Sequence, residues 1–379
     1  MTKKEKLQKF IKQQKKKTFK HAVILLPILI VIMFFLNVLH KPEIPVVEKE
    51  EDAVVTATFV GDIMLGRYVE HVMEQHGEEF IYKYVEPYFQ ISDYISGNFE
   101  HPVTTSDEYE KADKYIHLDA APTTVNTLKK MNFSVLNLAN NHTMDYGQDG
   151  LWDTLEAFSN ADLDLVGAGS SLEDAMDRIA YTETNHLTIA TLGFTDVYAE
   201  GFSANDYRGG VLPLDPTIFI PMIAEASEEA DLVVVHAHWG QEYDDQPTTR
   251  QQEMAKAMAD AGADIVIGHH PHVLQNIEVY NDTVIFYSLG NFVFDQGWTR
   301  TRSSAIVQYH LLEDGTGRFE VTPIYIREAQ PRPLGTFSWL KKNLIFRQLT
   351  KGSQDLQWVE KSGKLVFDVD HSEKLKEIE

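Results

Sequence analysis

Three histidines occur within four positions of the stretch GADIVIGHHPHVLQ, residues 262–275, directly after a run of aliphatic and β-branched residues. Such a run is typical of a buried strand. Burial of an imidazole is unfavourable unless the ring finds a hydrogen-bond partner or a metal ion. The cluster of His269, His270 and His272 therefore predicts partners elsewhere in the chain.

Polar side chains also follow most of the other strand-like runs. Because ligands of open α/β sheets collect beyond the carboxyl ends of the strands, we expect these side chains to converge on one region. The residues at these positions are Asp62, Arg67, Asn140, Asn141, His142, Asp145, His236, His238, Glu242, His269, His270, His272, Asn291 and Asp295. A further group, Asn98, Glu100 and His101, follows a stretch that predicts a helix.

Each of these residues, taken alone, has an ordinary structural explanation. An Asp that follows a strand is commonly a helix N-cap, and Asn is a common turn residue. His236 and His238 lie on one face of a strand and would form a partly buried pair. Together, however, carboxylate, amide and imidazole groups at five or six strand ends are what a metal site requires. Because the chain has no Cys, nitrogen and oxygen ligands favour Zn, Mn, Fe or a comparable divalent ion.

The elements that must position these groups alternate along the chain, which predicts an α/β layered domain. Short runs rich in β-branched residues predict strands covered on both faces. These runs are 54–60, 133–139, 163–168, 187–194, 231–237, 263–268 and 283–289. The stretches between them that predict helices are 123–131, 150–161, 218–230 and 250–263.

Charge is distributed unevenly along the 379 residues. Residues 1–40 contain nine Lys and one Glu, whereas the whole chain has a formal net charge of −23, so residues 41–379 carry −31. An acidic body argues against nucleic acid as a partner. The absence of Cys excludes disulfides and a thiol nucleophile.

An uncharged apolar run of 18 residues, 22–39, separates the basic head, 1–21, from the rest. As a helix it would be about 27 Å long, close to the hydrocarbon thickness of a bilayer. The preceding lysines predict a signal anchor with a cytoplasmic N-terminus and an extracellular body at the cell membrane. A cleaved signal peptide is the alternative, but no small-residue cleavage pattern follows the run. We expect a spacer over 40–53, the α/β domain over 54–329 and a peripheral C-terminal segment over 330–379.

Several long motifs resemble the CapA family of capsule-biosynthesis proteins, the membrane-anchored accessory subunits of bacterial poly-γ-glutamate synthases. The motifs are FVGDIMLGRYVE, GNFEHPVT, NLANNHTMDYG, GVLPLDP, HWGQEY, GADIVIGHHPHVLQ and VIFYSLGNFVFDQGWTRTR. The resemblance extends over nearly the whole chain, including the basic head and the tail LVFDVDHSEKLK.

The body of that family is in turn similar to calcineurin-like metallophosphoesterases, in which an αββα sandwich holds two metal ions. This similarity implies His142 as a proton donor and Arg67 as an anion clamp. Met64 stands where the phosphoesterase has a ligand His, and because a thioether is a poor ligand for a hard ion, one metal site loses a donor. The implied metal ligands are Asp62, Asn98 or Glu100 as the bridging group, Asn141, His238, His270 and His272.

The resemblance implies a membrane-anchored subunit of a poly-γ-glutamate synthase, required for synthesis or export of the polymer. Its partners would be the ligase and membrane subunits, the polymer and the membrane. No P-loop is present, so ATP-dependent ligation would belong to the partners. The divalent metal would fill both sites, one site or neither. Two alternatives stay open: an active extracytoplasmic hydrolase of phosphoesters or amides, and a purely structural scaffold.

Overall fold

The computed structural model describes residues 2–39, 43–297, 300–335, 338–353 and 356–375. The chain divides into two compact units, Met1–Glu43 and Ile44–Glu379. The buried residues of three hydrophobic clusters all lie in the second unit, which therefore has its own core.

The first unit consists of two helices, α1 (Lys3–Lys15) and α2 (Thr18–Leu39). A capping box between Thr2 and Glu5 begins α1, and lysines in its last turn suit the negative end of the helix dipole. None of the helices, over the residues that the structure describes, is both long and apolar enough to cross a membrane. The expected membrane helix over 22–39 ends in residues 34–39, whose side chains lie outside the described part of the chain.

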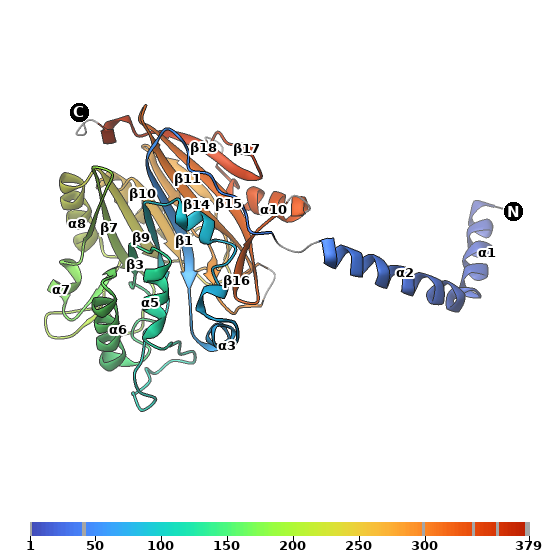
Figure 1. Ribbon diagram of the computed structural model, residues 1–379, viewed down its shortest axis with the longest axis horizontal. Helices are drawn as coiled ribbons and strands as arrows, with labels where there is room; N and C mark the ends of the chain where they lie inside the picture. Colours follow the sequence, from blue (N-terminus) through green and yellow to red (C-terminus); the bar gives the residue numbers. More distant parts are fainter. Residues whose placement is uncertain (1, 40–42, 298–299, 336–337, 354–355, 376–379) are drawn as a thin grey trace. The chain divides into compact units, whose positions relative to one another are not determined.

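The second unit is built around a large sheet of ten strands, in the order β17-β18-β15-β14-β1-β2-β3-β4, with β13 paired to β1 and β16 paired to β15 (Figure 1). The strands from β1 to β4 are parallel, and those from β14 to β18 are antiparallel. The bounds are β1 (Ala53–Ile63), β2 (Tyr94–Phe99), β3 (Val135–Asn137), β4 (Asp164–Val166), β13 (Asn291–Val293), β14 (Ser303–Leu312), β15 (Thr316–Arg327), β16 (Gln330–Pro333), β17 (Val359–Lys361) and β18 (Lys364–Asp370).

A second sheet of six strands has the order β11-β12-β10-β9-β7-β6. Apolar side chains of both sheets form one buried cluster, so the two sheets pack face to face. The bounds are β6 (Ala180–Thr184), β7 (Leu187–Thr195), β9 (Leu232–His238), β10 (Ile265–His269), β11 (Ile277–Tyr280) and β12 (Thr283–Phe286); β5 (Ala168–Gly169) and β8 (Gly210–Val211) form a separate pair.

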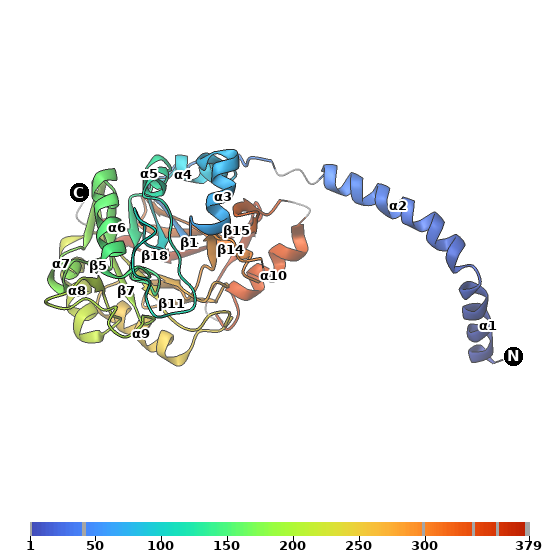
Figure 2. The ribbon, with the colours of Figure 1, turned by 90° about the horizontal axis from the view of Figure 1, so that it is seen from below.

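Helices cover the outer faces of both sheets (Figure 2). One cluster joins the large sheet to α3 (Arg67–His76), α4 (Glu86–Gln90), α5 (Thr123–Lys130) and α6 (Gly147–Ala161). Another cluster joins the small sheet to α7 (Leu172–Met176), α8 (Pro216–Glu229) and α9 (Thr249–Asp260). The remaining short elements are the 3₁₀ turns η1 (Glu78–Phe80) and η3 (Ser372–Leu375). The predicted mixed α/β layering is confirmed.

The C-terminal segment, expected to be peripheral, is an integral part of this body. Strand β18 pairs along β15 and extends the large sheet. Helix α10 (Trp339–Leu349) places Ile345, Phe346 and Leu349 in the cluster between the sheets. The segment loses the α/β alternation because it continues the antiparallel half of the sheet, where hairpins replace crossover helices.

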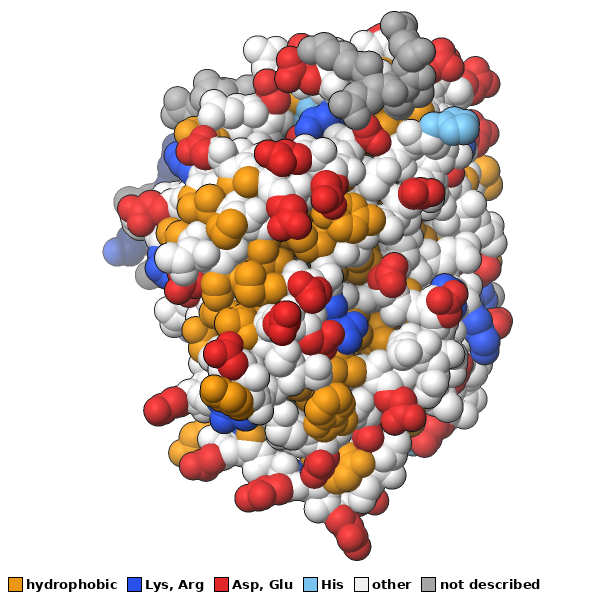
Figure 3. Space-filling model, turned by 90° about the vertical axis from the view of Figure 1, so that its left-hand side faces the viewer, with side chains coloured by type: hydrophobic (Ala, Val, Ile, Leu, Met, Phe, Trp, Pro, Cys, Tyr) orange, Lys and Arg blue, Asp and Glu red, His pale blue; other side chains and the backbone are white. Residues whose placement is uncertain are grey.

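The surface of the body is acidic. Figure 3 shows the side that carries α7 and α8, where Asp and Glu side chains are spread over the face and Lys and Arg are sparse. This distribution agrees with the net charge of −31 on residues 41–379, which opposes non-specific binding of polyanions.

Candidate metal centre

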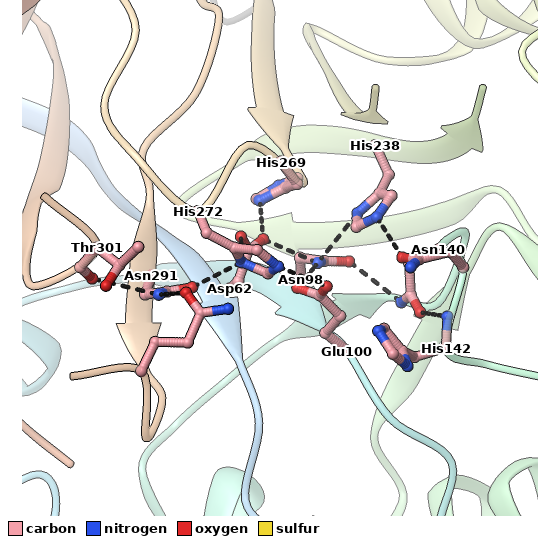
Figure 4. Close-up of polar contacts among 12 residues, drawn as sticks. Asp62, Asn98, Glu100, Asn140, His142, His238, His269, His272, Asn291 and Thr301 are labelled. Atoms are coloured by element: carbon pink, nitrogen blue, oxygen red, sulfur yellow. Dashed lines mark hydrogen bonds and ion pairs between the residues drawn. The ribbon is translucent and has the colours of Figure 1, made fainter. Parts of the chain in front are cut away.

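Two register lines, one in each sheet, bring the predicted residues together. In the large sheet, Asp62 is paired in register with Asn291 on one side and Asn98 on the other. In the small sheet, His238 is paired with His269. Both lines lie at the carboxyl ends of parallel strands, where ligands are expected. Figure 4 shows the imidazoles of the small sheet facing the carboxylates that extend from the large sheet.

The carboxylates are completely buried and closely surrounded. Asn98 Nδ2 donates to Asp62 Oδ1 at 2.9 Å and to Glu100 Oε2 at 3.3 Å. The Nδ1 atoms of His269 and His272 each lie 3.2 Å from an oxygen of Asp62. His272 Nε2 lies 3.5 Å from Glu100 Oε1. Two carboxylates without exposure to water require cationic or metal partners.

The turn that follows β10 aims the last two histidines. His270 and His272 have φ angles of 93° and 56°, in the left-handed region that L-residues rarely adopt. Pro271 lies between them, and its carbonyl accepts a hydrogen bond from Tyr243 N at 2.8 Å. Residues held in such conformations cluster at binding and catalytic sites, because the surrounding structure must over-determine them.

Two overlapping groups of side chains have the geometry of metal ligands. Glu100, His238 and His270 form one group, and Asp62, Glu100 and His272 form the other; within each group the ligand atoms lie within 4.8 Å of one another. Glu100 belongs to both groups. Four buried polar atoms here, Asp62 Oδ2, Glu100 Oε1, His269 Nδ1 and His270 Nδ1, have no hydrogen-bond partner. Unpaired buried donors and acceptors of this kind fit coordination by a metal ion.

Protonation in this region supports the same conclusion. Burial, together with the neighbouring His272, lowers the pKa of His270 to about 3. Burial also holds the pKa of His238 well below its ordinary value. Both rings are therefore neutral at pH 7, as a metal ligand must be.

The carboxylates and His272 behave as one coupled group. Burial and the charge of Asp62 raise the pKa of Glu100 well above its ordinary value. Burial also disfavours the charge on Asp62, but its close contacts with His269 and His272 hold its pKa well below the usual range. Although burial opposes protonation of His272, Glu100 and Asp62 raise its pKa to about 9. Without a metal, a proton on His272 therefore neutralises part of the buried negative charge.

A second layer of side chains orients the ligands. His272 Nδ1 donates to Asn291 Oδ1 at 2.8 Å, which leaves Nε2 free to face Glu100. His269 Nε2 and His236 Nδ1 lie 2.9 Å apart, and His236 Nε2 lies 3.0 Å from Ser96 Oγ. His269 in turn contacts Asp62, so these contacts connect Ser96 to Asp62 through the two imidazoles. Side chains that hold a ligand in place through its second atom are typical of metal sites.

His142, expected as a proton donor, is buried beside this centre and belongs to a separate triad. Its Nδ1 lies 2.7 Å from Asp145 Oδ2. Lys114 Nζ lies 2.5 Å from Asp145 Oδ1 and donates to Asn141 O at 2.8 Å. Burial lowers the pKa of His142, although Asp145 opposes this shift. A His oriented by a buried Asp is a geometry suited to proton transfer.

The other predicted residues occupy distinct positions. Asn141 Oδ1 lies 2.8 Å from His238 Nε2, beside the first ligand group. Asn98 turns its amide nitrogen toward Asp62 and Glu100, so in this arrangement it holds the carboxylates. Arg67 forms an ion pair with Asp295 and lies over the ring of Phe294. Met64 is buried in the apolar cluster against the outer helices and contributes no ligand.

Four residues of the centre were absent from the predicted ligand set although they touch it. Asn291, His236 and His269 carried the same strand-end signal as the predicted ligands. Lys114 carried no such signal, because it lies in the segment between β2 and α5, which has no periodic pattern. Only the three-dimensional path of that segment brings it to Asp145.

Comparison with known proteins assigns the chain to a family. Residues 56–296 match the family described as bacterial capsule synthesis protein PGA_cap. That match covers more than half of the chain and includes all of the residues that form the centre described above. The chain belongs to this family of bacterial capsule synthesis proteins.

Two relatives are similar over almost their whole length. The chain is 60% identical over 372 residues to the PGA biosynthesis protein CapA of Bacillus subtilis (strain 168), which covers 98% of this chain and 97% of that one. It is 48% identical over 379 residues to the capsule biosynthesis protein CapA of Bacillus anthracis, with coverages of 98% and 92%. A probable polyglutamine synthesis accessory protein of Mycobacterium tuberculosis is 28% identical over 286 residues, with coverages of 64% and 75%.

Solved structures give more distant matches. The NAD nucleotidase of Haemophilus influenzae has a TM-score of 0.36 at 10% identity, covering 78% of this chain and 62% of that one. The 5'-nucleotidase of Candida albicans SC5314 has a TM-score of 0.38 at 12% identity, with coverages of 70% and 48%.

Proposed function

We propose that this chain is a subunit of a poly-γ-glutamate synthesis machinery, required to make or export the polymer. The observation that carries the proposal is the 60% identity, over 98% of the chain, to a protein named for PGA biosynthesis. The word accessory in the name of a more distant relative supports a role beside other subunits. The sequence contains no P-loop, so the ATP-dependent ligase is assigned to a partner.

The second part of the proposal is a divalent metal of the Zn, Mn or Fe class at the candidate centre. Asp62, Glu100, His238, His270 and His272 would hold it, with Asn141 beside His238. The ion would supply a concentrated positive charge that attracts and polarises an oxygen atom of a ligand. Nitrogen and oxygen ligands without sulfur suit this class of ions.

The net charge of the body determines where on its surface a polyanion would be attracted or repelled. A net charge of −31 on residues 41–379 repels a polyglutamate chain from most of the surface. Attraction is expected at the metal centre, with Arg67 and Lys114 nearby. A growing polymer would therefore be attracted to the centre and repelled by most of the body, which favours its discharge outward.

A hydrolase is the second candidate function, and the His142–Asp145 pair is the observation that favours it. His142 is buried next to a half-buried Asn141, and its ring is held by a carboxylate that Lys114 also contacts. Such a ring could deliver a proton to the leaving group of a phosphoester or an amide. The third candidate, a structural scaffold, would need neither the metal nor this pair.

The experiment that separates these functions uses cells that lack the endogenous chain and make each variant in its place. If the metal centre is needed, Glu100→Gln should abolish polymer production, whereas Glu156→Gln, at an exposed glutamate on α6, should leave it intact. His142→Gln tests the hydrolase, because it should abolish turnover while leaving bound metal unchanged. Restoration of polymer by residues 1–53 alone would favour the scaffold and contradict the metal-dependent role.

Residues 22–39 form the anchor in this proposal, with the head in the cytoplasm and the body outside. The support is the uncharged run itself and the nine Lys that precede it. Protease added to wall-stripped cells should digest residues 41–379 and leave the head intact. Protection of the body would contradict this topology, and recovery of a shortened body without detergent would indicate signal cleavage.

A further inference from the structure

The outward face of α10 exposes large apolar side chains. Trp339, Leu340 and Leu344 are 62%, 59% and 56% exposed. The opposite face of the helix, with Ile345, Phe346 and Leu349, is buried between the two sheets. Folding of the body therefore explains the inner face of the helix and leaves the outer face unexplained. Contiguous exposed apolar surface of this kind marks a site of interaction with a protein or a membrane.

The exposed face continues onto the neighbouring strand segment. Trp358 packs against Phe346 with ring centroids 5.9 Å apart, and Val359 follows it at the start of β17, at the sheet edge. A hollow of about 320 Å³ lies between Trp358 and α10, and Leu340, Leu344 and Arg347 form part of its wall. We call the residues Trp339, Leu340, Leu344, Trp358 and Val359 the α10 surface.

The stretch of chain that carries this surface is locally basic, whereas the body as a whole is acidic. Residues 338–364 contain six Lys or Arg and two Asp or Glu, whereas residues 41–379 as a whole carry −31. Lys341, Arg347 and Lys361 are exposed. Lys341 Nζ lies 3.4 Å from the ring centroid of Tyr325, which holds this cation beside the apolar side chains. Lys342, Lys351 and Lys364 are ion-paired with Glu360, Asp245 and Glu320. Lys341, Arg347 and Lys361 have no ion pair among the described residues, and these three cations favour an anionic partner.

The α10 surface also lies near the point where the chain enters the body. Glu50 is ion-paired with Arg318 at 2.6 Å, and Arg318 lines a second surface hollow together with Trp358 and Val359. Eleven peptide units connect Leu39, the end of the proposed anchor, to Glu50. Fully extended, they span at most about 40 Å. If residues 22–39 are the anchor, this length is the upper limit on the distance between the lipid and Glu50.

We infer that the α10 surface docks the body on an anionic lipid surface. The inference rests on the proposed anchoring by residues 22–39. Trp side chains favour the membrane interface, and Leu side chains on the same face enter the acyl boundary while Lys and Arg contact the headgroups. Each basic residue near an anionic surface adds to the attraction.

The test uses residues 44–379, the unit that has its own core, and measures co-sedimentation with vesicles. The body should bind phosphatidylglycerol vesicles and should bind phosphatidylcholine vesicles at least tenfold more weakly, with binding reduced by salt. Leu340→Glu with Leu344→Glu, and Lys341→Glu with Arg347→Glu, should each weaken binding at least tenfold. Trp339→Ala should weaken it, whereas Trp152→Ala is the matched control, because Trp152 is 51% exposed on α6.

Three outcomes would overturn the inference. One is a wild-type body that does not sediment with phosphatidylglycerol vesicles, and another is unchanged binding by the Leu340→Glu, Leu344→Glu body. The third is a dimer of the body, dispersed by Leu344→Glu, in the absence of vesicle binding, which would assign the surface to a second copy. Failure of the proposed topology is a separate result, because protease protection of the body in cells leaves vesicle binding in vitro unaffected.

Discussion

The metal centre and the α10 surface depart from the usual rule of burial in opposite directions. At the centre, Asp62 and Glu100 are charged groups without any exposure to water. On the α10 surface, Trp339 and Leu344 are large apolar groups that are mostly exposed. A pair of buried carboxyl groups with an oxygen left unbonded and an exposed Trp are both unfavourable for an isolated monomer. Each place therefore indicates what is to be bound there.

The two places differ in how much of the fold they require. The centre draws on strands of both sheets, β1, β2, β9 and β10, and on the turn after β10. The α10 surface draws on one helix and the start of one edge strand. At the centre, a substitution that preserves the size and shape of the side chain should change metal binding with little effect on folding. A substitution that changes size or shape should disturb folding as well. Substitutions of Trp339, Leu340 or Leu344 that are compatible with a helix should leave folding nearly unchanged.

The largest effect is expected for Glu100→Gln, because Glu100 is shared by both ligand groups. Loss of a direct ligand should exceed the roughly 10–100-fold decrease in affinity that is typical of changes to supporting residues. Metal analysis of the purified body should find little bound ion, while the melting temperature of the chelated protein should stay close to that of the chelated wild type. A metal content equal to that of Glu156→Gln would remove Glu100 from the ligand set.

His270→Ala and His272→Ala should each lose metal more strongly than His269→Ala. His269 contacts Asp62 through Nδ1 and His236 through Nε2. It belongs to neither ligand group and therefore supports the ligand Asp62 rather than binding the ion itself. Its loss should lower affinity by about 10–100-fold. Titration of the chelated variants with one divalent ion gives the comparison. Equal affinities for all three variants would contradict the division into ligands and supporting residues.

A pH effect of intermediate size follows from His272. Its pKa is raised to about 9 in the folded protein by Glu100 and Asp62, against the effect of burial. Protonation of this ring stabilises the metal-free fold below about pH 6.5, and the stabilisation decreases as the pH rises toward about 9. Metal binding must displace this proton. We expect affinity to rise by up to about tenfold per pH unit over this interval.

Calorimetric titration with Mn²⁺ in two buffers of different ionisation enthalpy would measure this displaced proton. At least one proton should be released per ion bound at pH 7. In His272→Asn the release should decrease, although the remaining ligand group still binds. An affinity that does not change between pH 6.5 and 8.5 would show that His272 is neutral before the metal arrives.

The smallest effect is expected for a substitution on the α10 surface, measured as the stability of the body. Leu344→Glu exchanges one exposed side chain for another and should change the free energy of unfolding by no more than about 0.5 kcal/mol. Ile345→Glu is its matched neighbour on the buried face and should unfold the body, because a carboxylate would enter the core between the sheets. Denaturant titration of both variants measures the difference. A strongly destabilised Leu344→Glu body would show that the outer face packs inside the molecule.

The sequence predicted the parallel half of the fold well. Runs such as 187–194 and 231–237 became β7 and β9 because β-branched residues buried on both faces leave a clear pattern. It missed β2, in which Ser96, Gly97 and Asn98 interrupt the apolar run. Those polar residues are buried because they contact His236, Asp62 and Glu100, and a pattern of single positions does not contain such contacts.

The sequence also predicted most of the centre, since strand ends are visible as polar positions after apolar runs. The sequence could not predict that Asn98 holds the carboxylates instead of binding the metal. Whether an amide presents its oxygen to a metal or its nitrogen to carboxylates depends on its neighbours, here Asn137 and Asn140, whose Nδ2 atoms donate to Asn98 Oδ1 at 3.0 and 3.3 Å. The sharing of Glu100 by two groups likewise depends on the distance between the sheets.

The division of the ligands between two sheets sets the time at which the centre can form during biosynthesis. The chain is made from its N-terminus, and the ligands extend from Asp62 to His272. Neither ligand group is complete until the turn after β10, which carries His270 and His272, has left the ribosome. On the proposed topology that moment comes outside the cell, so the extracellular supply of metal, rather than the cytoplasmic one, would decide which ion the finished protein carries.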